Sequence, residues 1–129
     1  MALRVVRLGT PRVADEGLRI GTVRRPPRGV PRSVFARQDW YDVWFPPLSP
    51  SAELVKQAHE AITAADWNAF FRHYKAEMKA PAAAHALDLL AALSQHSNIS
   101  VGCYCEDEAH CHRMALRELL VARGAMLVE

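Results

Sequence analysis

The chain has 129 residues, of which 50% are hydrophobic and 23% are charged, and this is the size and composition of one globular domain. Sixteen Lys and Arg residues against 14 Asp and Glu residues give a net charge of +2, which excludes a polybasic nucleic-acid arm or an acidic tail as the main theme. Three cysteines are too few for a disulfide framework, and no apolar run approaches the roughly 18 residues of a membrane span. The first residues hold no apolar leader, so we expect a cytoplasmic, reducing location, where clustered cysteines indicate metal or thiol chemistry.

The first part of the chain predicts short strands separated by turns. Strands are expected at 5–8 and 18–23, where short runs of β-branched and apolar residues end at turn or proline-rich segments. The segment 24–31 holds three prolines and three arginines, which excludes regular structure there. A third strand or extended segment is expected at 41–45, where two prolines end it.

Helical patterns follow. Ser49 is expected to cap the first helix, with Pro50 at the first helical position. Asp66 is expected to cap a second helix, whose aromatic residues recur at steps of three and four and indicate core packing. A third helix is expected at 81–95 and a strand at 99–105.

The last part of the chain predicts a helix and a strand. Asp107 is the expected cap of this helix, Gly124 ends it, and 125–128 is a final strand. The unit 99–128 would then be a right-handed β-α-β crossover. These elements predict one three-layer α/β domain over 1–129, with a short, mostly parallel or mixed sheet flanked by about four helices.

All three cysteines lie within the segment 103–113, which reads Cys-Tyr-Cys-Glu-Asp-Glu-Ala-His-Cys-His-Arg. This segment joins a predicted strand to a predicted helix. Ligands of open α/β sheets bind outside the carboxyl ends of strands, and helix N-termini favour anions and thiolates. The junction is therefore the candidate functional site.

Three interpretations of this segment stay open. In the first, Cys105 or Cys111 is a reactive nucleophile. Its general base is His110 or His112, and Arg113 clamps an oxyanion or a phosphate.

The second interpretation is a metal site. Cysteine and histidine are ligands that zinc favours, and Cys105, His110 and Cys111 are the candidate set, with Cys103 or His112 to complete it. The segment has one Cys-x-Cys and no second paired motif, which argues against a closed structural zinc site. In the third interpretation Cys103 is a small core hydrophobe and the two histidines are polar surface residues. A Cys103–Cys105 disulfide is not expected, because alternate strand residues lie near the upper limit of bridgeable separation.

Positive charge is concentrated in the first third of the chain. Nine arginines lie between positions 4 and 37, against Asp15 and Glu16. Arginine suits two-pronged contact with phosphate or carboxylate. Arg24 and Arg28 follow a predicted strand, so in a parallel sheet they would lie at the same edge as the cysteine segment.

We therefore predict a pocket for a small anionic or nucleotide-like ligand, with Glu106 and Asp107 as further candidate contacts. A nucleic-acid-binding or other interaction role is the non-enzymatic alternative. The residues imply no membrane partner, and zinc is the one cofactor that they suggest.

Four segments, taken in order, resemble the YeaO-like domain-of-unknown-function family, number 488. They are Pro27-Arg28-Gly29, Pro50-Ser51-Ala52-Glu53-Leu54, the Trp-x-x-Phe…Tyr-x-x-Glu helix of 67–78, and Cys105-Glu106…Cys111-His112-Arg113. The resemblance covers nearly the whole chain and implies a compact α/β domain of bacterial or archaeal distribution with no established reaction. Val23 and Pro26 stand where the family has Asp and Trp, and both departures touch the proposed pocket.

Overall fold

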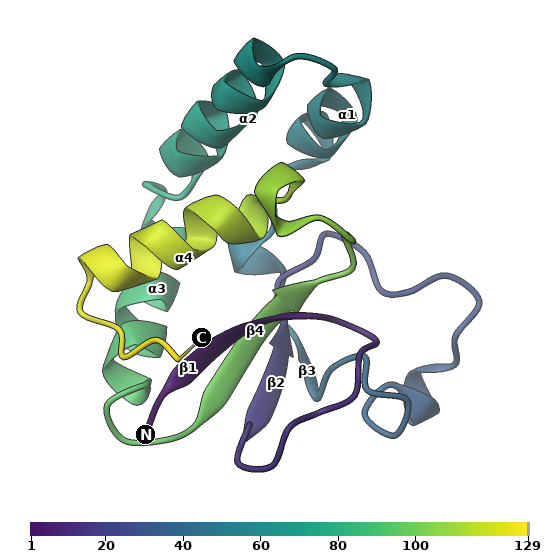
Figure 1. Ribbon diagram of the computed structural model, residues 1–129, viewed down its shortest axis with the longest axis vertical. Coiled ribbons are helices and arrows are strands. Elements are labelled where there is room, and N and C mark those ends of the chain that lie inside the picture. Colours follow the sequence, from purple (N-terminus) through teal and green to yellow (C-terminus); the bar gives the residue numbers. More distant parts are fainter. Residues whose placement is uncertain (129) are drawn as a thin grey trace.

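The computed structural model describes residues 1–128, which form a four-stranded parallel sheet and four α-helices (Figure 1). The strands are β1 (Leu3–Arg7), β2 (Leu18–Gly21), β3 (Val43–Trp44) and β4 (Ile99–Cys103). The helices are α1 (Ala52–Glu60), α2 (Ala64–Glu77), α3 (Pro81–Leu93) and α4 (His112–Ala122). Short 3-10 turns lie at Arg32–Val34, Pro46–Leu48 and Glu108–His110. The predicted α/β fold with a short parallel sheet and four helices is confirmed.

The strand order is β1-β4-β2-β3, so β4 lies inside the sheet although it comes last in the chain. Ile99 of β4 is in register with Leu3 of β1 on one side and with Leu18 of β2 on the other. All of these pairings are parallel, and the carboxyl ends of β1, β2 and β4 therefore lie at one edge of the sheet. This edge carries the candidate site.

One face of the sheet is covered by the helices. Ile20, Ile99 and Val101 point to this face and belong to a buried cluster with residues of all four helices. The helical members include Leu54, Phe70, Tyr74, Leu87, Leu116 and Leu120. Burying one large apolar side chain contributes about 1.5–3 kcal/mol, so this cluster holds helices and sheet together.

Loops cover the opposite face, where the strands carry small residues. A Cβ atom on Gly102 would lie 2.6 Å from the carbonyl oxygen of Val6, and the ring of Tyr41 lies directly over Gly21. A second buried cluster lies on this face and consists of Leu8, Val23, Tyr41, Cys103 and Cys111, with Phe35 and Trp40 packed against it. Helices, sheet and loops are thus the three layers of the domain.

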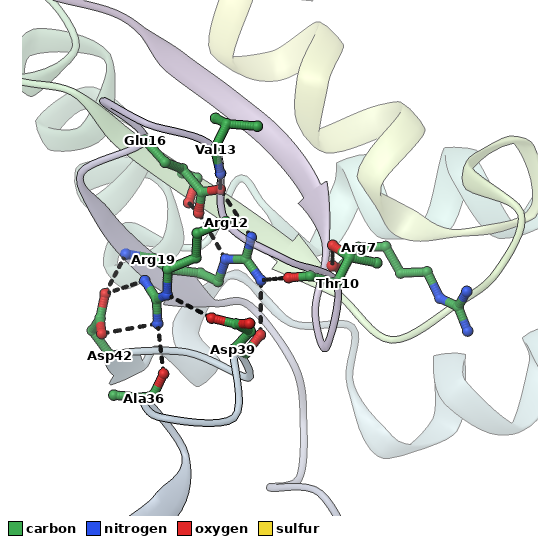
Figure 2. A network of polar contacts seen from close by, with 10 residues as sticks. Arg7, Thr10, Arg12, Val13, Glu16, Arg19, Ala36, Asp39 and Asp42 are labelled. Atoms are coloured by element: carbon green, nitrogen blue, oxygen red, sulfur yellow. Dashed lines mark hydrogen bonds and ion pairs between the residues drawn. The ribbon is translucent and has the colours of Figure 1, made fainter.

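A buried polar network ties the loop layer to the sheet (Figure 2). The Arg19 guanidinium donates to both carboxylate oxygens of Glu16, at 2.7 and 2.9 Å. It also donates to the carbonyl oxygens of Thr10 and Asp39, at 2.8 and 2.7 Å. The Ser100 hydroxyl of β4 donates to the same Glu16 carboxylate at 2.8 Å. Burial raises the pKa of Glu16, but the hydrogen bonds from Arg19 and Ser100 lower it by more, so its pKa lies below the ordinary value.

The first helix begins two residues later than predicted. Ser51 is its N-cap, and the Ser51 hydroxyl accepts a hydrogen bond from the Leu54 amide at 3.2 Å. Ser49, the predicted cap, donates its hydroxyl to the carbonyl oxygen of Pro46 instead. The Ser49 hydroxyl is therefore used in the preceding 3-10 turn and is not the cap of the helix.

The predicted cap of the second helix is also wrong. Thr63 is the N-cap and Asp66 is the third helical residue, and the two form a reciprocal capping box. The predicted final strand at 125–128 is reduced to one bridge between Leu3 and Leu127. Within the described chain, no helix has both the length and the apolar character needed to cross a membrane.

Candidate functional site

The chain leaves β4 at Cys103 and enters α4 at His112, after a connection that holds the short 3-10 turn Glu108–His110. Cys111 is the N-cap of α4, with an extended backbone at φ −148° and ψ 150°. Asp107, the predicted cap, accepts a hydrogen bond from the Ala109 amide and caps only the short 3-10 turn that precedes the helix. The prediction of Asp107 as the cap of α4 is therefore wrong, and a cysteine stands at the start of the helix.

The three cysteines converge with one histidine. The Sγ atoms of Cys103 and Cys111 and a ring nitrogen of His112 lie within 4.8 Å of one another, and all three residues are buried. Cys105 is exposed, and its Sγ lies 3.8 Å from the Sγ of Cys103. All three cysteines are free thiols, as the sequence predicted for the Cys103–Cys105 pair.

The backbone fixes the orientation of His112. Its Nε2 lies 2.8 Å from the carbonyl oxygen of Thr22. Because a carbonyl oxygen only accepts hydrogen bonds, Nε2 carries a proton, and in the neutral ring Nδ1 keeps its lone pair. Nδ1 lies 3.8 Å from the Sγ of Cys111. His112 thus presents a base or a metal ligand to the cysteines.

Arg113 is turned inward and is only 3% exposed. Its Nε donates to the Sγ of Cys111 at 3.4 Å, and its Nη2 donates to the carbonyl oxygen of Cys105 at 2.6 Å. The guanidinium therefore holds the two ends of the turn together and places a positive charge beside Cys111. Arg113 does not line the cleft described next.

The contacts within the cluster separate the pKa values of the three thiols. The pKa of Cys111 is lowered because its sulfur accepts hydrogen bonds from the thiols of Cys103 and Cys105, and their effect outweighs that of burial, which raises this pKa. The pKa of Cys103 is raised, since the thiol donates to the other two and is buried. At Cys105 the hydrogen bond with Cys103 lowers the pKa, but the hydrogen bond with Cys111, burial and the charge of Cys111 raise it by more. Negative charge is therefore most favourable on Cys111.

The cluster lies in the wall of a cleft of about 1280 Å³. Five basic residues line this cleft: Arg7, Arg24, Arg25, Arg28 and Lys56. Among the described residues, Glu106 is the only acidic one in the lining, and its carboxylate lies 3.7 Å from the Arg7 guanidinium. The cleft thus carries an excess of positive charge.

His110 belongs to the wall of the cleft rather than to the cysteine cluster. Its ring stacks on Trp67 with centroids 4.6 Å apart and planes 8° from parallel. Its Nδ1 lies 3.4 Å from a carboxylate oxygen of Asp107. The donor atoms that converge are therefore not the predicted metal set of Cys105, His110 and Cys111, because His112 occupies the place expected for His110.

The structure brings most of the candidate residues to one place. Arg24 and Arg28 line the same cleft as Cys105 and Cys111, which is the juxtaposition that the parallel sheet predicted. The sequence interpretation missed the role of Thr22, whose carbonyl oxygen orients His112. The available signal was its position directly after β2, at the edge of the sheet where the cysteine segment also begins.

Comparison with known proteins places the chain against a family model. Residues 3–124 match a family model described as the active DUF488-N3 subclade. No curated protein matches the chain, and no solved structure does.

Proposed function

We propose that the cleft of this chain, which belongs to the DUF488 family of domains of unknown function, binds a small anion. The anion would be phosphate-bearing and nucleotide-like. The bound anion would lie beside the cysteine–histidine cluster of Cys103, Cys105, Cys111 and His112. The match confirms the predicted family 488, while the YeaO-like branch stays a prediction.

One observation carries this proposal: the cleft holds guanidinium groups without a counter-charge. Arg24, Arg25 and Arg28 are exposed on the proline-rich segment after β2, and none forms an ion pair with a described residue. Among the described residues, the Arg24 side chain makes one hydrogen bond, from its Nε to the carbonyl oxygen of Pro50 at 3.1 Å. A guanidinium group can donate two parallel hydrogen bonds to the oxygens of one phosphate. A phosphate-bearing ligand would therefore supply the negative charge that these arginines lack.

The start of α4 adds to this field. Cys111 and His112 line the cleft, and the positive end of the helix dipole therefore opens toward the same space. Glu106 is paired with Arg7, which reduces its repulsion of an anion. A ligand phosphate would therefore meet positive potential from two sides.

A reactive thiol is the second candidate function, and the geometry favours Cys111 over Cys105. Cys111 alone has both an imidazole nitrogen, Nδ1 of His112 at 3.8 Å, and a guanidinium, that of Arg113 at 3.4 Å, beside its sulfur. In this role Cys111 is the nucleophile and His112 is the base. Arg113 positions the turn, since its guanidinium is buried. This function requires a Cys111 thiol that carries no metal.

Calorimetric titration with inorganic pyrophosphate and with adenosine diphosphate tests the anion site. We expect both probes to bind, with an affinity that falls as salt is added. The double variant Arg24→Ala/Arg28→Ala should bind roughly tenfold or more weakly, because it loses charge-assisted hydrogen bonds. Arg37→Ala is the matched control, since Arg37 is exposed but outside the cleft.

The proposal fails if neither probe binds at low salt, or if the double variant and the Arg37 control bind equally well. Binding of a single-stranded oligonucleotide with no binding of the mononucleotide would instead support the predicted nucleic-acid role.

A further inference from the structure

All three cysteines of the chain belong to the cysteine–histidine cluster. Cys103 and Cys111 are buried with His112, and Cys105 approaches Cys103 from the side of the cleft. From this arrangement we infer that Cys103, Cys111 and His112 bind a thiophilic divalent ion of the zinc class, with Cys105 as the fourth ligand. The inference goes beyond the anion site, because it concerns the cluster itself and not the basic residues.

The separations of the donor atoms fit tetrahedral zinc. Two sulfur ligands at about 2.3 Å from zinc lie about 3.8 Å apart, and a sulfur and an imidazole nitrogen lie about 3.6 Å apart. The Cys103 and Cys105 sulfur atoms are 3.8 Å apart. The Cys111 sulfur and Nδ1 of His112 are also 3.8 Å apart. The three buried donors already lie within 4.8 Å of one another, so an ion would need only small side-chain movements to reach them. Cys105 lies outside this group and would have to turn further toward the ion from its place beside Cys103.

The surroundings of His112 are those of a metal ligand. A histidine ligand usually donates its second ring N–H to a carbonyl or carboxylate, which fixes the tautomer and the ring orientation. Nε2 of His112 donates to the carbonyl oxygen of Thr22 at 2.8 Å, so Nδ1 is left with its lone pair toward the cysteines. The Thr22 hydroxyl in turn donates to the carbonyl oxygen of Gly102 at 2.9 Å, which anchors this residue to β4.

The charges of the site also balance. Three thiolates and one divalent cation give a net charge close to −1, and the neutral His112 adds none. The buried guanidinium of Arg113 donates to the sulfur of Cys111 at 3.4 Å and supplies the compensating positive charge. Without an ion, the same site would hold three sulfur groups, two of them buried, whose hydrogen bonds to one another are weak.

The position of Cys105 makes the site open on one side. Cys105 is exposed and lines the cleft, whereas the other three ligands are buried. The ion would therefore enter through the cleft, and Cys105 is the ligand that solvent or an anion can replace. This is the arrangement of metal sites that keep one exchangeable position.

Metal analysis of the tag-free, full chain tests the inference. Protein purified under reducing conditions without chelator should contain one equivalent of zinc, and Cys103→Ser and Cys111→Ser should each lose it. Cys105→Ser should retain zinc but release it faster to a chelator. His110→Ala is the control, because His110 lies next to the cluster in sequence but stacks on Trp67, and it should keep its zinc.

Two measurements on the wild-type chain cover the case in which the serine variants do not fold. Reduced, metal-free protein titrated with Co²⁺ should develop thiolate-to-cobalt charge-transfer bands that zinc abolishes. Alkylation by iodoacetamide should be slow in the zinc-loaded protein and fast after chelation. A reduced protein that binds neither zinc nor Co²⁺ would overturn the inference and leave the reactive-thiol function in its place. Zinc retained in folded Cys103→Ser and Cys111→Ser would also overturn it, because the ion would then lie elsewhere.

Discussion

At the scale of single residues, the arginines of the first third have different roles that a charge count cannot separate. Arg19 is fully buried with Glu16, and Arg12 pairs with Asp39 and Asp42. Arg7, in contrast, lies at the cleft, as do Arg24, Arg25 and Arg28. Sequence alone showed the excess of arginine, but the partners depend on how the loops pack on the sheet. The anion site therefore uses fewer arginines than the composition suggested.

Glu16 provides a test of the buried network. Removing one member of a buried ion pair leaves the other unpaired, which costs about 3–5 kcal/mol. We expect Glu16→Gln to lower the free energy of unfolding by about this amount, measured by urea denaturation at pH 7. Glu60→Gln, at an exposed position at the end of α1, should change it by less than about 0.5 kcal/mol.

The same pair predicts a pH dependence. The pKa of Glu16 is lower in the native protein than its ordinary value of 4.5, so the unfolded chain binds this proton more readily. The stabilisation by Glu16 is therefore complete above about pH 4.5 and is lost as the pH falls through the native pKa. The stability difference between wild type and Glu16→Gln should shrink between pH 7 and pH 3. A constant difference would contradict the role assigned to the ionised carboxylate.

At the scale of elements, apolar periodicity predicted each helix, whereas the caps were misplaced by a few residues. Several hydroxyl and carboxyl groups stand near each helix start, and which one acts as the cap depends on its other hydrogen bonds. Ser49 illustrates this, because its hydroxyl is already used in the 3-10 turn before α1. The same limit applied to Cys111, whose place at the start of α4 depends on a turn that the sequence did not reveal.

The capping box of α2 gives the prediction at this scale. The Thr63 hydroxyl accepts a hydrogen bond from the Asp66 amide at 3.1 Å, and the Asp66 carboxylate accepts one from the Thr63 amide at 3.0 Å. Thr63→Ala should lower the free energy of unfolding by about 1 kcal/mol. Ser33→Ala, at an exposed position whose hydroxyl makes no hydrogen bond within the described chain, should have little effect. Equal thermal stability of the two variants would show that this cap does not contribute.

The candidate site was partly predictable, but from a different rule than the helices. Parallel strands have their carboxyl ends at one edge of the sheet, and this rule predicts from the sequence alone that Arg24 and Arg28 lie near the cysteine segment. The rule does not specify side-chain direction. It therefore could not show that Arg113 points inward, or that His112 rather than His110 faces the sulfur atoms.

At the scale of the whole molecule, both ends of the described chain lie side by side (Figure 1). The Leu3 amide donates to the carbonyl oxygen of Met126 at 2.7 Å, and the Val128 amide donates to the carbonyl oxygen of Leu3 at 2.9 Å. The Met126 amide also donates to the hydroxyl of Ser94 at 3.0 Å. The segment after α4 thus covers the start of the outer edge of β1, at Leu3.

Removal of residues 125–129 tests this cover. We expect the truncated chain to lose about 2–4 kcal/mol of stability, because it loses these three hydrogen bonds and some apolar contact. It should also associate at high concentration through the uncovered edge of β1, measured by light scattering. Met126→Ala keeps the backbone bonds and is the control. If the truncated chain were as stable as this control, the cover would contribute nothing to stability.

The inner position of β4 has a consequence for folding. β1 pairs with β4, which begins at Ile99, so the sheet can form completely only after most of the chain has been synthesised. Contacts between residues so far apart in sequence require the closure of a long loop, which slows folding. Until β4 arrives, β1 and β2 have no partner between them, and their edges are open to other chains. β4 therefore has two roles. It ends at Cys103 and leads into the segment with the other two cysteines, and its pairing with β1 and β2 completes the sheet.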